Sequence, residues 1–244
     1  MKNTSQKVLS IVVLLWILFY LSIALLGQAA LEGKIGINLL YAATITALTG
    51  LLLIKGFQYL VEKIDQSRGT IVFIVILSVL VVVPRYILNV NFSVLQESDY
   101  EKYLTISQYM FLGERIPDNE LLYIKEWASN QFIIEKIFSF SYYIWGNIGQ
   151  QAPLYLNIWF TLGYVLLFYM VCKDLLNKSI AFIAAATLAV WPENVMNSIY
   201  LLSEPMYMFF LFAGIAFCWY GVKYSRSWLW LLGGGLLRIS QEIG

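Results

Sequence analysis

Three carboxylates near the ends of apolar segments are the side chains whose positions could support chemistry: Asp99, Glu193 and Glu204. A carboxylate within or beside an apolar membrane segment is costly unless it has a partner or a function. The sequence contains no histidine, which excludes histidine-based triads, histidine-ligated metal sites and histidine proton shuttles. Acid–base chemistry would therefore fall to carboxylates, tyrosines or lysines, and a carboxylate can remove a proton from a hydroxyl group.

Each of these carboxylates also fits an ordinary structural role. Asp99 follows Ser98 in a pattern typical of a helix start, where acidic side chains and caps are favoured. Glu204 precedes Pro205, and this pair is equally typical of the first turn of a helix. Glu193 fits a solvated turn after a chain break. Position alone leaves both the structural and the catalytic interpretation open for each residue.

One basic residue, Arg85, lies close to the end of an apolar run, directly after Pro84. There it could bind a phosphate or an anionic headgroup. An arginine that extends its head to the membrane interface would fit the same position.

The composition indicates an integral membrane protein. Hydrophobic residues make up 60% and charged residues 13% of the 244 residues, whereas a soluble domain averages about 45–50% apolar and about 25% charged. The net charge of +1 provides no basic surface for nucleic acid. Cys172 and Cys218 form no CxxC pair, so neither a zinc nor a redox motif is present.

Seven apolar runs are long enough, or nearly so, for the roughly 20 residues that a membrane-spanning helix needs. They are Val8–Leu26, Ile37–Ile54, Ile71–Leu88, Pro153–Cys172, Ile180–Trp191 with an extension toward Leu202, Pro205–Val222 and Trp228–Leu237. The first run is longer than the usual apolar region of a signal peptide, so we expect an uncleaved helix. Isolated strands would leave backbone groups unpaired in lipid. The sequence therefore predicts an all-α, polytopic membrane helix bundle of about seven transmembrane helices, with a break at Pro192.

Lysine and arginine alternate between the loops on the two sides of these runs. The basic loops contain Lys2, Lys7, Lys55, Lys63, Arg68, Lys173, Lys178, Lys223 and Arg226. Because cytoplasmic loops are enriched in such residues, this pattern predicts a multi-pass protein of the cell membrane with a cytoplasmic N-terminus.

One long outer loop, residues 89–151, contains eight of the fifteen acidic residues and many aromatic ones. Apolar side chains recur at helical spacing from Tyr100 to Phe111, and a second apolar stretch covers Phe132–Trp145. Both stretches predict interfacial helices lying along the outer leaflet. We therefore divide the chain into residues 1–70, a transmembrane hairpin with its cytoplasmic loop, and residues 71–244, which include the outer loop.

Several short segments, in a fixed order between about residues 71 and 237, carry a resemblance to a known family. They are Pro84-Arg85, Ser98-Asp99-Tyr100 with Tyr103, Ala152–Asn157, Lys173–Lys178, Ala185–Glu193 and Tyr200–Met206. Their order resembles the GT-C superfamily of integral-membrane glycosyltransferases. It is most similar to the protein O-mannosyltransferases and the transferases that use lipid-linked sugars.

This resemblance implies a function and a set of site residues. It implies transfer of a sugar, with inversion, from a polyprenyl-phosphate donor to a hydroxyl of a glycan, lipid or protein acceptor on the extracytoplasmic side. Asp99 matches the catalytic base, although the adjacent acidic pair of many relatives is missing here. Arg85, Tyr103, Glu193 and Glu204 are the expected substrate-binding residues. No cofactor and no metal site are expected, although some relatives bind a divalent metal near this aspartate.

Relatives usually continue through further helices, so we expect this sequence to be truncated at its C-terminus, and its own activity is open. Two other functions fit parts of the pattern: half of a transporter or flippase, and a non-catalytic membrane subunit in cell-envelope assembly. Internal inverted symmetry would favour transport, and the sequence shows none.

Overall fold

The computed structural model describes residues 69–92, 94–126, 132–146 and 149–243, together with a few scattered positions between 48 and 62. The chain divides into two compact units, Met1–Val72 and Phe73–Gly244. The first two predicted spans lie outside the described residues, apart from isolated positions in the second.

Among the residues that the structure describes, three helices are long and apolar enough to cross a membrane: α3 (Gly69–Asn91), α7 (Gln151–Leu175) and α10 (Glu204–Lys223). They match the third, fourth and sixth predicted runs to within a few residues. All regular elements in the described part of the chain are helices, so the all-α prediction is confirmed there. The number seven stays a prediction, because the described residues contain three candidate spans, or up to four.

The fifth predicted run forms a broken helix. Helix α8 (Lys178–Ala189) begins after Asn177, whose Oδ1 accepts a hydrogen bond of 2.9 Å from the Ile180 amide. The chain then bends by 51° into α9 (Pro192–Met196) and a 3-10 turn, η1 (Asn197–Ile199). Proline has no amide hydrogen to continue the preceding helix and is favoured at the first position of a new one. The predicted break at Pro192 is therefore confirmed.

The seventh run forms α11 (Ser227–Ile243), which has 17 residues. At 1.5 Å per residue it extends roughly 26 Å, somewhat less than the roughly 30 Å hydrocarbon core of a bilayer. It packs closely against α10, where a Cβ added to Gly233 would lie 2.9 Å from the Gly214 carbonyl oxygen and 2.5 Å from Cys218 Sγ. Glycine at position 233 thus allows the two helix backbones to approach.

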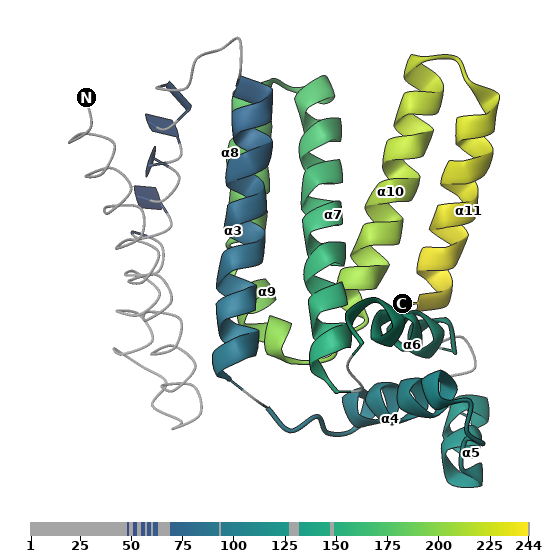
Figure 1. The fold of residues 1–244 in the computed structure, drawn as a ribbon. Helices are drawn as coiled ribbons and strands as arrows, with labels where there is room; N and C mark the ends of the chain where they lie inside the picture. Colours follow the sequence, from purple (N-terminus) through teal and green to yellow (C-terminus); the bar gives the residue numbers. More distant parts are fainter. Residues whose placement is uncertain are drawn as a thin grey trace, which may run out of the picture. The chain divides into compact units, whose positions relative to one another are not determined.

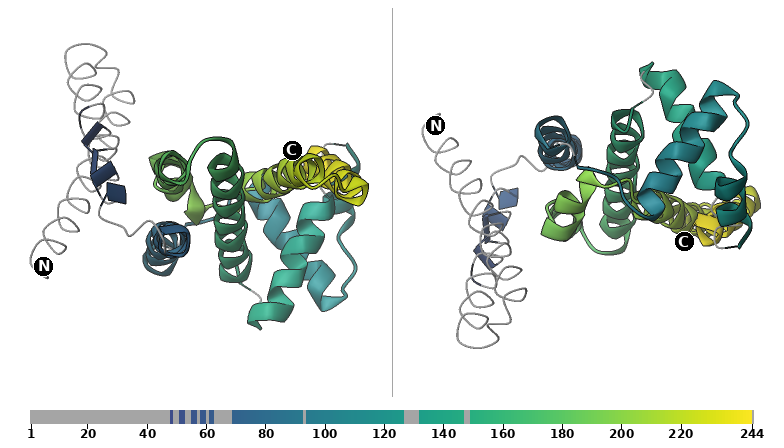
Figure 2. Two further views of the ribbon diagram at one scale, coloured as in Figure 1. Left: turned by 90° about the horizontal axis from the view of Figure 1, so that it is seen from above. Right: turned by 90° about the horizontal axis from the view of Figure 1, so that it is seen from below.

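The outer loop folds into three helices: α4 (Asp99–Leu112), α5 (Asp118–Glu126) and α6 (Phe132–Trp145). The sequence predicted α4 and α6 but not α5. Helices α4 and α6 pack together and lie crosswise to the spans, as Figures 1 and 2 show. A buried apolar cluster joins them to α7, α10 and α11; it consists of Tyr103, Ile134, Phe138, Leu154, Leu201, Met206 and Ile243. The position of α4 and α6 in the membrane interface stays a prediction.

Aromatic contacts pack the spans side by side. The ring of Phe73 in α3 stacks on Phe182 of α8 at 4.3 Å between centroids and meets Tyr169 of α7 edge-on at 6.4 Å. The ring centroids of Phe160 in α7 and Phe209 in α10 lie 5.3 Å apart. Helix α3 ends, and α7 and α10 begin, at the same end of the bundle (Figure 1). The predicted site residues, which lie at these helix ends, are thereby brought to one region.

Candidate functional site

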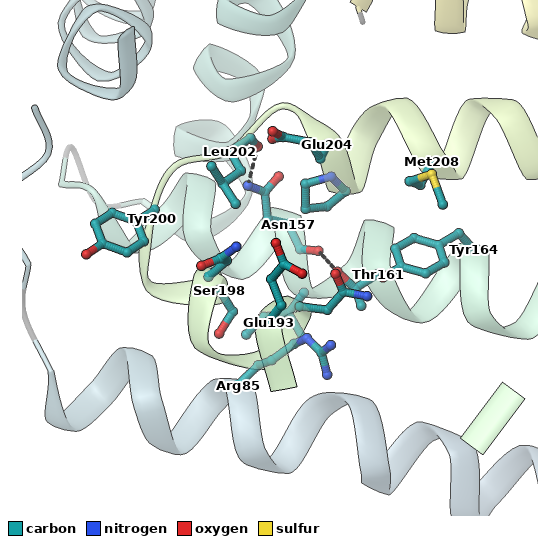
Figure 3. Close-up of a pocket in the computed structure, with 14 residues that line it drawn as sticks. Arg85, Asn157, Thr161, Tyr164, Glu193, Ser198, Tyr200, Leu202, Glu204 and Met208 are labelled. Carbon is teal, nitrogen blue, oxygen red and sulfur yellow. Dashed lines mark hydrogen bonds between the residues drawn. The ribbon is translucent and has the colours of Figure 1, made fainter. Parts of the chain in front are cut away.

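A polar pocket lies between α3, α7, α9 and the first turn of α10 (Figure 3). Its volume is about 180 Å³, and hydroxyl, amide and charged side chains form much of its wall. Three of the predicted site residues line it: Arg85, Glu193 and Glu204. The lining does not include Asp99 or Tyr103.

Arg85 is held rigidly at the pocket wall. Its side chain is 1% exposed, and its Nη1 donates hydrogen bonds to the carbonyl oxygens of Val81 at 3.1 Å and Ala189 at 3.0 Å. The second bond joins α3 to the C-terminal end of α8. An arginine whose head extends to the membrane interface would be exposed, so the buried position argues against that interpretation. A role of Arg85 in anion binding stays a prediction.

Glu193 and Glu204 come from two consecutive helix starts. Glu193 lies in the first turn of α9, and Glu204 is the first residue of α10, followed by Pro205. The helix start predicted at Glu204 is confirmed, whereas Glu193, predicted in a solvated turn, lies in a short helix. Both side chains are exposed, and both residues line the pocket. In Figure 3 the Glu193 carboxylate lies between Asn157 on one side and Arg85 on the other.

Asp99 is the first residue of α4, as the sequence predicted, and its side chain is exposed. Ser98 makes no capping hydrogen bond with its side chain. Burial raises the pKa of Tyr100, and the charges of Glu204 and Asp99 raise it further. The charges of both carboxylates therefore reach the same phenol.

The charge of Asp99 also acts on Tyr103, which is buried in α4. Burial, followed by the charges of Asp99 and Glu135, raises its pKa to about 12, while a hydrogen bond with the Ser203 side chain acts in the opposite direction. The phenol therefore stays protonated at neutral pH. Tyr103 is 3% exposed and packs on Phe138 with ring centroids 6.4 Å apart. It supports the segment before Glu204 and is not part of the pocket surface.

Gln96 connects the start of the outer loop to the chain before α10. Its Oε1 accepts a hydrogen bond of 2.9 Å from the Leu201 amide, and its Nε2 donates to the Ile199 carbonyl at 3.1 Å. The rings of Tyr100 and Tyr200 lie 5.9 Å apart at the same junction. These contacts hold Asp99, three residues after Gln96, beside the segment that carries Glu204. Sequence reasoning missed Gln96, since its partners lie more than 100 positions away.

Sequence reasoning also missed Asn157, which lies in the first turns of α7 and lines the pocket. Its Nδ2 donates a hydrogen bond of 2.8 Å to the Leu202 carbonyl. One turn later, Thr161 Oγ1 donates to the Asn157 carbonyl at 2.8 Å. Polar side chains four positions apart within the apolar run 153–172 were the signal that could have indicated a site facing the bundle interior.

A comparison with family models gives one match. Residues 153–240 match the family described as dolichyl-phosphate-mannose-protein mannosyltransferase. The match confirms the resemblance to the GT-C glycosyltransferases. The comparisons with curated proteins and with solved structures found no match.

The GT-C match covers α8 to α10, nearly all of α7 and most of α11. Asn157, Glu193 and Glu204 lie inside the matched range, whereas Arg85 and Asp99 lie before it. The geometry brings both groups of residues to one end of the bundle.

Among the described residues, no group of three or more Asp, Glu or Cys side chains is arranged to hold a metal ion.

Proposed function

We propose that this chain carries the site of a membrane glycosyltransferase that moves a sugar from a polyprenyl-phosphate donor to an acceptor hydroxyl on the extracytoplasmic side. The match to a mannosyltransferase family over residues 153–240 supports the class of reaction. The observation that carries the proposal is that Glu204 and Arg85 line one pocket, while the charges of Glu204 and Asp99 both act on Tyr100. A lipid-linked donor suits a pocket at one end of a membrane bundle, because the lipid can remain in the bilayer.

The proposed reaction is a single displacement at the anomeric carbon. The acceptor oxygen forms a bond to this carbon while Asp99 takes the hydroxyl proton. The bond between the anomeric carbon and the phosphate oxygen breaks, and its electron pair leaves with the lipid phosphate. Attack from the opposite face inverts the anomeric centre, and one carboxylate base is sufficient. The leaving phosphate is already anionic and needs no proton.

The remaining predicted residues bind or position the substrates in this proposal. Arg85 offers a fixed guanidinium for the donor phosphate, because such a group binds phosphate through several hydrogen bonds. Glu193 and Glu204 accept hydrogen bonds from substrate hydroxyls, and Tyr103 positions the chain before Glu204. Neither the transporter nor the non-catalytic subunit is favoured by the family match.

Substitution of Asp99 by asparagine tests the proposal. The Asp99→Asn side chain keeps its size but cannot take a proton, so sugar transfer should fall by about 100- to 10,000-fold. Transfer is measured with the chain in lipid nanodiscs, using a radiolabelled short-chain polyprenyl-phosphate mannose. The matched control is Glu101→Gln, which changes an exposed carboxylate in the same first turn of α4. Equal activity of Asp99→Asn and Glu101→Gln would remove Asp99 as the base.

A further inference from the structure

Of the two polar atoms in the Asn157 side-chain amide, the nitrogen has a hydrogen-bond partner in the described part of the chain and the oxygen has none. The side chain is 4% exposed and lines the pocket. Its Nδ2 is bound to the Leu202 carbonyl at 2.8 Å, which fixes the orientation of the amide plane. Within the described part of the chain, its buried Oδ1 has no hydrogen-bond partner.

A buried acceptor without a donor is unusual. Most buried side-chain polar atoms in proteins have a partner, and each exception calls for an explanation such as a ligand or an ordered water. Rotation of the amide is no remedy, because Oδ1 would then face the Leu202 carbonyl, acceptor against acceptor, and Nδ2 would lose its partner. A molecule bound in the pocket that Asn157 lines is one source of the missing donor, and an ordered water is the other.

We propose that Asn157 determines donor specificity by accepting a hydrogen bond from one hydroxyl group of the sugar. This inference rests on the proposed function and names a recognition contact within the same pocket. A hydroxyl supplies the hydrogen that Oδ1 lacks, whereas a phosphate, which presents only acceptors, would be repelled. In this proposal Asn157 recognises the sugar and not the lipid phosphate.

The surrounding residues fit a polyhydroxylated ligand. The same pocket is lined by Thr161, Tyr164 and Ser198, whose hydroxyls can donate or accept, and by two further asparagines at positions 194 and 197. Glu193 lies next to Asn157 in Figure 3 and adds an acceptor for a neighbouring hydroxyl. A site built from such groups discriminates strongly against a substrate that lacks one of the hydroxyls it binds.

The test compares donors that differ by one hydroxyl. Binding and transfer are both measured for short-chain polyprenyl-phosphate mannose and its 2-, 3-, 4- and 6-deoxy analogues, with the 244-residue chain in nanodiscs. For the wild type, we expect one analogue to bind about 10- to 100-fold more weakly than the parent donor and to lose a similar factor in kcat/KM. The hydroxyl that this analogue lacks is the one that would otherwise donate to Oδ1. In Asn157→Ala, the parent donor should weaken by a similar factor, and the penalty for that analogue should disappear.

Gln96→Ala is the matched control. Gln96 holds Ile199 and Leu201 in the segment that Asn157 also holds, but it does not line the pocket. A purely structural effect on this segment would weaken all five donors uniformly, and we expect that pattern for Gln96→Ala. The same uniform loss in Asn157→Ala, with the analogue penalty retained, would overturn the inference.

The two measurements separate this inference from the proposed function. If binding depends on one hydroxyl but no transfer occurs, the result would support Asn157 as the specificity-determining residue and contradict the proposed glycosyltransferase function. Transfer without any difference between the deoxy analogues would support the enzyme and overturn the role of Asn157, leaving water as the partner of Oδ1. Absence of donor binding would overturn both.

Discussion

Glu135 is a buried acid that the proposed chemistry does not use, and its charge should control the stability of the outer-loop helices. It lies in the first turn of α6 and is 0% exposed. Neither carboxyl oxygen has a hydrogen-bond partner within the described part of the chain. Burial raises its pKa from 4.5 to about 7. The titratable group that responds to it across the packed face is Tyr103 of α4, which stays protonated in this range.

The size and the sign of the effect follow from this shift. A pKa raised from 4.5 to about 7 corresponds to about 3 kcal/mol, at about 1.4 kcal/mol per unit. The folded state holds the proton more tightly than the unfolded state. The contribution of Glu135 is therefore fully present below pH 4.5, decreases as the pH rises, and is lost above about pH 7. Glutamine has nearly the same shape and no charge, so the Glu135→Gln variant should lack this decrease.

The assay measures the free energy of local opening of α6 and α4. Amide hydrogen exchange of the chain in nanodiscs reports it between pH 5 and 8. After correction for the intrinsic pH dependence of exchange, the opening free energy of wild type should fall by up to about 3 kcal/mol relative to Glu135→Gln. Glu114→Gln, an exposed carboxylate in the turn after α4, is the control and should follow wild type. Parallel pH profiles for wild type and Glu135→Gln would refute the reasoning.

Two further substitutions test the packing and the pocket. Gly233→Ala should destabilise the α10–α11 pair by about 1–3 kcal/mol in thermal unfolding, because the new methyl group would meet Cys218 and the Gly214 backbone; Gly234→Ala, with open space at its Cβ, is the control. Arg85→Gln should raise the dissociation constant of polyprenyl-phosphate mannose by about 10-fold or more, and unchanged affinity would remove Arg85 as the phosphate ligand.

The parts of this fold that could be predicted are those that depend on local composition. Helices α3, α7 and α10 follow from long apolar runs, because each must bury or solvate its surface in lipid along its whole length. Helices α4 and α6 follow from aromatic residues at helical spacing. Helix α5 (Asp118–Glu126) was missed because it has only nine residues, and its four apolar ones, 121–124, follow one another directly without the spacing of a helical face.

The candidate site could be predicted only in part for the same reason. Glu193 and Glu204 are marked by the prolines that begin their helices, and Asp99 by a helix-start pattern. Gln96 and Asn157 carry no such mark. Their contacts, to residues 105 and 45 positions away, exist only once the chain has folded.

The irregular chain between α8 and α10 explains why these unmarked residues matter. Two helix breaks leave its backbone groups without helical partners, and unpaired groups of this kind are costly inside a membrane protein. Three polar side chains from elsewhere supply the partners: Arg85 bonds the carbonyl at 189, Gln96 the backbone at 199 and 201, and Asn157 the carbonyl at 202. Because Glu193 and Glu204 are carried by this same segment, their positions in the pocket depend on these three side chains. Arg85 and Asn157 also line the pocket, so two of the three groups that fix the backbone also form part of its wall.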